Sequence, residues 1–158
     1  MNTSHGQAAR EREMVELQRL LSEVETALDD DPTSAKTTAQ RAVLLARIGR
    51  VEEALQSYDK ALELQPDFAD VLFNRSNLLR DLGRHEEALA GYERALELEP
   101  DDSALLNNRG VILFMLERYQ EALDSYARAI ALRPDYADAF TNRGNALQEL
   151  GLHEEAVN

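Results

Sequence analysis

The sequence predicts an all-α fold, an α-solenoid of antiparallel helical hairpins that stack on one another. The four prolines of the 158-residue chain follow one another at intervals of 34 residues, at Pro32, Pro66, Pro100 and Pro134. Alanine and tyrosine recur on the same period, at Ala54, Ala88 and Ala122 and at Tyr58, Tyr92 and Tyr126. A period of this length is typical of a solenoid, because one repeat cannot bury its apolar face alone and must stack on its neighbours.

The segment before the first proline predicts a capping helix at residues 11–31. Its apolar residues lie on one helical stripe: Leu17, Leu20, Leu21, Val24, Ala27 and Leu28. We expect this helix to cover the first face of the stack. Residues 1–10 lack an apolar pattern and are expected to be disordered, as chain termini commonly are.

The repeat array is expected at residues 32–158, and one repeat shows how each is built. The repeats span about residues 35–68, 69–102, 103–136 and 137–158, of which the last is incomplete. In the second repeat, Leu72 and Leu79 mark the buried stripe of a first helix, and Gly83 ends that helix in a left-handed conformation. The second helix carries Ala88 and Tyr92, and Pro100 stops it. Each repeat is therefore one helical hairpin.

The fourth repeat ends at Asn158, soon after its second helix would begin. Phe140, Leu147 and Leu150 are then expected to have less cover than their equivalents in earlier repeats. Since solenoids generally need a polar cap, we expect the chain to be the front part of a longer array or to associate with itself through this uncapped C-terminal end.

The order of small and large residues resembles the tetratricopeptide repeat over about residues 35–158. The third repeat follows the pattern at Leu106, Gly110, Leu113, Ala122, Tyr126, Ala129 and Pro134. One departure recurs, because arginine replaces the usual leucine at Arg41, Arg75, Arg109 and Arg143. The resemblance implies a right-handed superhelix whose first helices line a concave groove and whose second helices form the convex back.

The groove is the expected binding site for a protein or peptide ligand. The residues that we expect to contact the ligand are Gln40, Phe73, Asn74, Asn77, Asn107, Asn108, Val111, Phe114, Met115, Asn142 and Asn145. Asn74, Asn108 and Asn142 recur at the repeat spacing, and an amide can both donate to and accept from the main chain of an extended peptide. The alternative is that these amides bond between helices or face solvent. Similar asparagine ladders occur in bacterial repeats that precede O-GlcNAc transferase-like domains, and the chain resembles repeats of that kind.

Three further groove features leave alternatives open or exclude a ligand class. Phe73, Val111, Phe114 and Met115 form a contact patch if they are exposed together, or else pack between neighbouring first helices. The four recurring arginines, which we call the arginine column, either pack on the adjacent repeat and pair with acidic side chains, or orient acidic groups of a ligand. Family members that grip a C-terminal carboxylate use a basic clamp, but Phe73, Asp138 and Asn142 occupy its basic positions here, so no such clamp is expected.

Composition excludes several functions. The net charge of −13 disfavours nucleic acid, and the chain has no cysteine. It has neither an N-terminal apolar signal region nor a run of about 18 apolar residues, so we expect a cytoplasmic protein with no membrane partner. His85 and His153 hold the same position in different repeats, and no phosphate loop, metal-spaced cluster or nucleophile motif is present. No catalytic residue, cofactor or metal ion is expected.

These observations favour a protein-interaction scaffold that binds an extended peptide or a helix of a partner in its groove. The visible chain is not expected to be an enzyme by itself. The alternative function is a substrate-recruiting arm of a larger enzyme, such as an O-GlcNAc transferase-like glycosyltransferase. A catalytic domain in the reading frame after residue 158 would favour this alternative.

Overall fold

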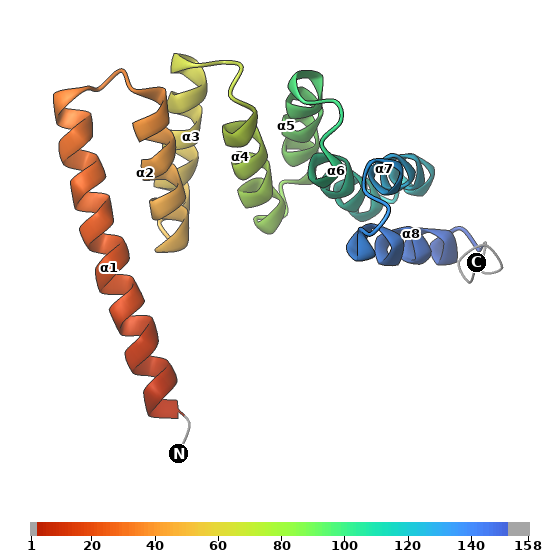
Figure 1. Ribbon diagram of the computed structural model, residues 1–158, viewed down its shortest axis with the longest axis horizontal. Coiled ribbons are helices and arrows are strands. Elements are labelled where there is room, and N and C mark those ends of the chain that lie inside the picture. The colour runs from red at the N-terminus through yellow and green to blue at the C-terminus, as the bar shows by residue number, and fades with distance from the viewer. Residues whose placement is uncertain (1–2, 152–158) are drawn as a thin grey trace. The chain divides into compact units, whose positions relative to one another are not determined.

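The computed structural model describes residues 3–151, with side chains from Gln7 onward, and this part of the chain is entirely helical (Figure 1). Its eight helices are α1 Thr3–Asp30, α2 Ala35–Arg47, α3 Val51–Leu64, α4 Ala69–Asp81, α5 His85–Leu98, α6 Ser103–Met115, α7 Tyr119–Leu132 and α8 Ala137–Glu149. The predicted all-α fold of helical hairpins is thereby confirmed. The expected second helix of the fourth repeat lies outside the described residues, as do the first two residues of the predicted N-terminal segment.

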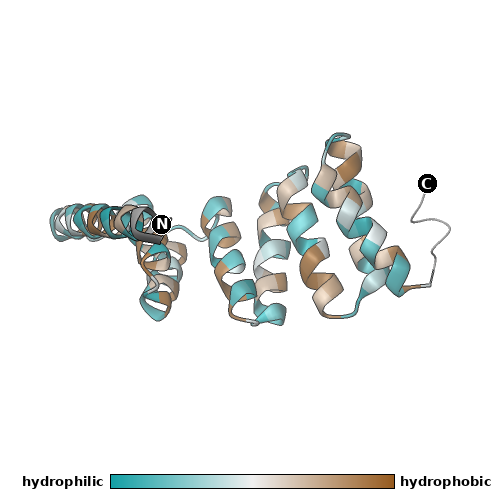
Figure 2. Cartoon of the chain, turned by 90° about the horizontal axis from the view of Figure 1, so that it is seen from below, coloured by the Kyte–Doolittle hydropathy of each residue, from teal (hydrophilic) through white to brown (hydrophobic). Residues whose placement is uncertain are grey.

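The chain folds as two compact units, and the boundary between them in the sequence falls within α4. The N-terminal unit runs to Val71 and contains α1, α2 and α3, and the C-terminal unit starts at Leu72 and contains the rest of α4 and α5 to α8. In the N-terminal unit α1 packs on α2, and α2 on α3; in the C-terminal unit α6 packs on both α5 and α7, and α8 packs on α7. In Figure 2 the helices carry both hydrophobic and hydrophilic residues, as expected of amphipathic helices that bury one face.

Helix α1 begins at Thr3, whereas the sequence predicted disorder up to residue 10. Leu17 and Leu21 are buried and anchor the C-terminal half of the helix. Residues 7–16 are mostly Gln, Ala, Arg, Glu and Met, which all favour a helix, so the helix extends from this anchor without further apolar contacts. Arg12 also donates to the carbonyl oxygen of Ala8 at 3.2 Å. The absence of an apolar pattern was therefore a poor indicator of disorder.

The hairpin turns follow the expected chemistry at most positions. Gly49, Gly83 and Gly151 adopt the left-handed conformation, with φ of 83°, 73° and 73°. In the third hairpin Glu117 takes this position with φ of 60°, although a residue with a side chain is strained there. Asp102 caps α6 by accepting from the backbone N–H groups of Ala104 and Leu105 at 2.6 and 2.9 Å.

The core of each hairpin is a tyrosine of the second helix packed where small residues let the two helices approach. Tyr58, Tyr92 and Tyr126 are 3%, 0% and 1% exposed, which agrees with their prediction as core residues. Neighbouring hairpins are joined in the C-terminal unit by a cluster of Leu106, Ala129 and Ala139. Leu147 is also buried, whereas the sequence predicted that it would lack cover; Phe140 and Leu150 are exposed as predicted.

Alkaline pH is expected to destabilise the protein through these three tyrosines. Burial raises the pKa of Tyr58 and of Tyr92 to about 12, and it raises the pKa of Tyr126 as well. In the unfolded chain a tyrosine ionises near pH 10, so the native state holds protons that the unfolded state has lost. The free energy of unfolding should therefore be unaffected by these groups below about pH 10 and fall between about pH 10 and 12.

A combined titration measures this effect, with tyrosinate absorbance and helical circular dichroism followed in the same sample. We expect the buried tyrosines to ionise together with the loss of helix. If they ionise fully near pH 10 while the helical signal persists, the hairpin cores are not closed as described.

Candidate functional site

A polar cluster joins α4, α5 and α6 in the C-terminal unit. In this unit α4, α6 and α8 are the first helices of their repeats, and we call the side that they form the first-helix face. Arg80 Nη1 donates to Asn108 Oδ1 at 2.9 Å and lies 3.5 Å from Asn77 Oδ1. The hydroxyl of Tyr92 donates to the same Asn77 oxygen at 2.7 Å, and Asn108 Nδ2 donates to the carbonyl oxygen of Ala104 at 2.8 Å. We call Asn77, Arg80 and Asn108 the amide cluster.

The charge of Arg80 is paired with the neighbouring Asp81, while one nitrogen of its guanidinium group still contacts the amides. Its Nε and Nη2 donate to Asp81 Oδ1 at 3.0 and 2.9 Å, while Nη1 remains directed at the amides. The Arg80 side chain is 26% exposed, so water screens these contacts only in part. The cluster is therefore an ordered polar surface at the junction of two first helices.

The three amides of the predicted column, Asn74, Asn108 and Asn142, differ in their burial and contacts. Asn142 Nδ2 donates to Asn107 Oδ1 at 3.1 Å, and Asn107 itself is only 6% exposed. Asn74 is half-buried and Asn145 is exposed, while Gln40 is exposed in the N-terminal unit. Of the predicted amides, Asn77 and Asn108 are linked through Arg80, which contacts both. Asn107 is not on the surface but accepts the hydrogen bond of Asn142.

Apolar side chains lie on the same helices as the amide cluster. The Phe73 ring lies 6.1 Å from the ring of Tyr92, and the Phe114 ring meets Tyr119 edge-on at 5.3 Å. Phe73, Val111 and Phe114 are half-buried, and Met115 is 47% exposed. Phe73 and Phe114 therefore pack against rings of second helices, which neither sequence-based interpretation foresaw, whereas Met115 faces solvent.

Arg80 and Tyr92 are the members of this surface that were not among the expected ligand contacts, although helical spacing gives Arg80 a position in the groove. A signal for Arg80 was present, because Ala46, Phe114 and Gln148 occupy its position in the other repeats and none of them is charged. The repeat pattern marked Tyr92 only as a core position, which it shares with Tyr58 and Tyr126.

Two of the four recurring arginines, Arg41 and Arg109, bond to side chains of neighbouring helices. Arg41 Nε donates to Glu25 at 3.2 Å and Nη1 donates to the Ser57 hydroxyl at 2.7 Å. In the C-terminal unit Arg109 repeats this pattern with Glu93 and Ser125, at 2.9 Å from Nη2 and 2.7 Å from Nη1. Because both guanidinium groups are directed at neighbouring helices, the structural interpretation is favoured over a row of ligand-binding arginines.

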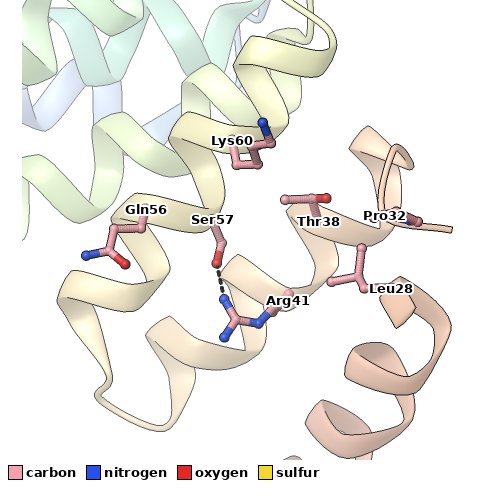
Figure 3. A pocket seen from close by; sticks show the side chains of 7 residues that line it. All are labelled: Leu28, Pro32, Thr38, Arg41, Gln56, Ser57 and Lys60. Carbon is pink, nitrogen blue, oxygen red and sulfur yellow. Dashed lines mark hydrogen bonds between the residues drawn. The ribbon is translucent and has the colours of Figure 1, made fainter. Parts of the chain in front are cut away.

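Figure 3 shows a hollow of about 280 Å³ in the N-terminal unit, beside the Arg41–Ser57 hydrogen bond. It is lined by Leu28, Pro32, Thr38, Arg41, Gln56, Ser57 and Lys60. Two repeats further on, Arg128 takes the position of Lys60 and donates to the carbonyl oxygen of Pro100 at 3.2 Å. Lys60 instead pairs with Glu63 at 3.0 Å, and no side chain among the described residues donates to the corresponding carbonyl oxygen of Pro32. We assign no ligand to this hollow.

Replacing Lys60 by arginine is expected to close the hollow and stabilise the N-terminal unit. The longer guanidinium can repeat the contact of Arg128 by donating to the carbonyl oxygen of Pro32. We expect the free energy of unfolding to rise by about 0.5–1 kcal/mol, as for one added hydrogen bond at a partly exposed site. Urea denaturation measures the change, and Lys36→Arg on the exposed side of α2 is the matched control. Equal effects of the two substitutions would contradict this explanation.

The described residues offer neither a metal site nor a membrane span. Between Thr3 and Gly151 no group of three or more His, Asp or Glu side chains is placed to hold a metal ion. None of the helices that the structure describes is both long and apolar enough to cross a membrane.

Family comparisons match most of the chain. Two models, both described as tetratricopeptide repeat, match residues 21–69, 39–103 and 73–137 and residues 125–158, respectively. A comparison with curated protein sequences finds no significant match.

Solved structures of the same fold include MamA and YrrB. A crystal structure of MamA has a TM-score of 0.86 at 20% identity, over 94% of this chain and 86% of that chain. Residues 41 to the end of MamA from Desulfovibrio magneticus RS-1 give 0.85 at 17% identity, over 97% and 86%. YrrB, described as a TPR protein with an unusual peptide-binding site, gives 0.80 at 26% identity, over 92% and 75%. The MamA structures show the shared fold alone.

Proposed function

Because the chain belongs to the tetratricopeptide repeat family, we propose that it is a protein-interaction scaffold that binds an extended segment or a helix of a partner protein. The binding surface is the first-helix face of the C-terminal unit. The observation that carries this proposal is the amide cluster, in which Asn77 and Asn108 are held in place by hydrogen bonds, and Met115 is exposed on the same helix as Asn108. The description of YrrB as a protein with a peptide-binding site supports the same ligand class.

The surface combines the two properties that peptide recognition needs. Ordered amides hydrogen-bond to main-chain groups, which every peptide has, and neighbouring apolar side chains gain from burying the ligand's side chains. The amides lose little conformational entropy on binding, because contacts within the protein already restrict them. We therefore expect moderate affinity and loose sequence preference.

Selection of random linear peptides displayed on phage tests this proposal. We expect the protein to enrich binding peptides, and one enriched peptide to lose about tenfold or more in affinity for the double variant Asn77→Ala/Asn108→Ala, as for the loss of two hydrogen bonds. Gln120→Ala, an exposed amide on the second helix α7, is the matched control and should bind normally. Failure to enrich any peptide, or full affinity in the double variant, would count against the proposal.

Two finer proposals build on the same features. The asparagines of the first helices also fit a substrate-recruiting arm of a larger enzyme, such as an O-GlcNAc transferase-like glycosyltransferase. Self-association through α8 is supported by Phe140, which is 48% exposed although Leu72 and Leu106 in the same position are buried. Equilibrium sedimentation that gives a monomer at high protein concentration would contradict self-association.

A further inference from the structure

Arg80 is the one residue of the amide cluster whose side chain can donate hydrogen bonds but cannot accept them. A guanidinium group only donates hydrogen bonds, and a backbone carbonyl only accepts them. Asn108 lies between two such groups, with Arg80 Nη1 on its Oδ1 at 2.9 Å and the carbonyl oxygen of Ala104 on its Nδ2 at 2.8 Å. Turning this amide over would place its NH₂ against Arg80 and its oxygen against a carbonyl, so both contacts would become repulsive.

The same argument applies to Asn77. Its Oδ1 accepts from the Tyr92 hydroxyl at 2.7 Å and faces Arg80 Nη1 at 3.5 Å. Since Arg80 cannot accept, the oxygen edge of Asn77 is the edge that turns inward. The NH₂ group of Asn77 has no hydrogen bond among the described residues, and one N–H of Asn108 is left over beside its bond to Ala104.

We propose that Arg80 is a positioning residue that turns Asn77 and Asn108 into hydrogen-bond donors only, so that this part of the surface recognises carbonyl oxygens of a bound peptide. The ligand class rests on the proposed peptide-binding function, whereas the orientation of the two amides is a property of the chain itself. The nearby guanidinium adds positive potential, which also favours the oxygen end of a peptide group. An amide without such a neighbour could instead present either edge.

The orientation is tested without any ligand by NMR of the asparagine side-chain amides. In the wild type we expect one Nδ2 proton of Asn108 to be protected from exchange by its bond to Ala104. In Arg80→Met we expect the Asn77 and Asn108 signals to shift and this protection to weaken, because the carbonyl oxygen of Ala104 must then orient the Asn108 amide without Arg80. Arg80→Lys should restore protection in part, since an ammonium group also only donates.

The control is Arg47→Met, an exposed arginine at the end of α2, which should leave the Asn108 signals unchanged. Unchanged Asn108 signals in Arg80→Met would overturn the proposal, and so would the absence of any recovery in Arg80→Lys. Circular dichroism of each variant verifies that the helices remain folded. If Arg80→Met does not fold, protection of Asn108 in Arg80→Lys, compared with weaker protection in Arg80→Gln, decides the matter.

Binding of a phage-selected peptide tests the ligand class. Asn108→Asp keeps the size of the side chain and a partner for Arg80, but replaces the outward N–H by an acceptor oxygen. We expect affinity to fall at least tenfold. Because one carboxylate oxygen then also faces the Ala104 carbonyl, circular dichroism and urea unfolding verify that the variant is folded under the conditions of the binding assay. Unchanged affinity would overturn the proposal. If no peptide is selected at all, the proposed function fails, while the NMR result still decides the role of Arg80.

Discussion

Replacing Gly110 by valine is expected to lower the free energy of unfolding by about 3 kcal/mol, the upper end of what overpacking a core usually costs. A Cβ atom at this position would lie 2.5, 2.8 and 2.9 Å from Cε1, Cδ1 and Cζ of Tyr126. The Tyr126 ring is 1% exposed and cannot move away without disturbing its own neighbours. Urea denaturation followed by circular dichroism measures the loss.

Gly144 provides a matched control for this substitution. It holds the same position one repeat later, on α8, but a Cβ atom there meets nothing within 4 Å. Gly144→Val changes helix propensity in the same way, so the difference between the two variants isolates the packing term. Gly110→Ala should be milder, because the first hairpin buries an alanine, Ala42, at the same position of α2. Similar losses for the two valine variants would contradict the close approach of α6 and α7.

The second large effect is expected for Gly91→Ser in α5. A Cβ atom on Gly91 would overlap the hydroxyl oxygen of Ser76 in α4, and that buried hydroxyl has no hydrogen-bond partner among the described residues. We expect the single substitution to lower the free energy of unfolding by about 2–3 kcal/mol through overpacking. Ser76→Ala alone should raise it by about 1 kcal/mol, because it removes a buried polar atom that has no partner.

Combining the two substitutions should restore stability. The first hairpin already contains this pair, with Ala42 and Ser57 in the corresponding positions, and both are buried. A hydroxyl at position 91 would also stand where Ser57 and Ser125 accept from Arg41 and Arg109 in the neighbouring repeats. A double-mutant cycle should therefore show a favourable coupling of about 2–3 kcal/mol. Additive effects would mean that the two positions do not meet.

Much of the fold could be predicted from the repeat period, because backbone constraints act locally. Gly83 and Pro100 end helices through their own conformational preferences, and the structure places both helix ends where expected. Glu117 shows the limit of this reasoning. Its turn closes with the Arg118 N–H on the Leu113 carbonyl oxygen at 2.8 Å, the bond that Arg84 makes to Leu79 after Gly83, so the closed turn holds a glutamate in a conformation that its type disfavours.

The candidate site could be located from the sequence but not described. Helical spacing placed Asn77 and Asn108 on first helices, yet it could not show that Arg80 would reach Asn108 across 28 positions of the chain. That contact depends on the rotamers of two side chains on different helices. The burial of Asn107 was missed for the same reason, since helical spacing gave it a groove position that the packing of α6 and α8 covers.

The central claim is that a peptide binds to the first-helix face of the C-terminal unit, and chemical-shift mapping tests it most directly. A phage-selected peptide is titrated into isotope-labelled protein, and backbone and asparagine side-chain signals are followed. We predict the largest changes at Asn77, Asn108, Val111 and Met115. Changes confined to the exposed residues of α5 and α7, with these four unaffected, would contradict the claim.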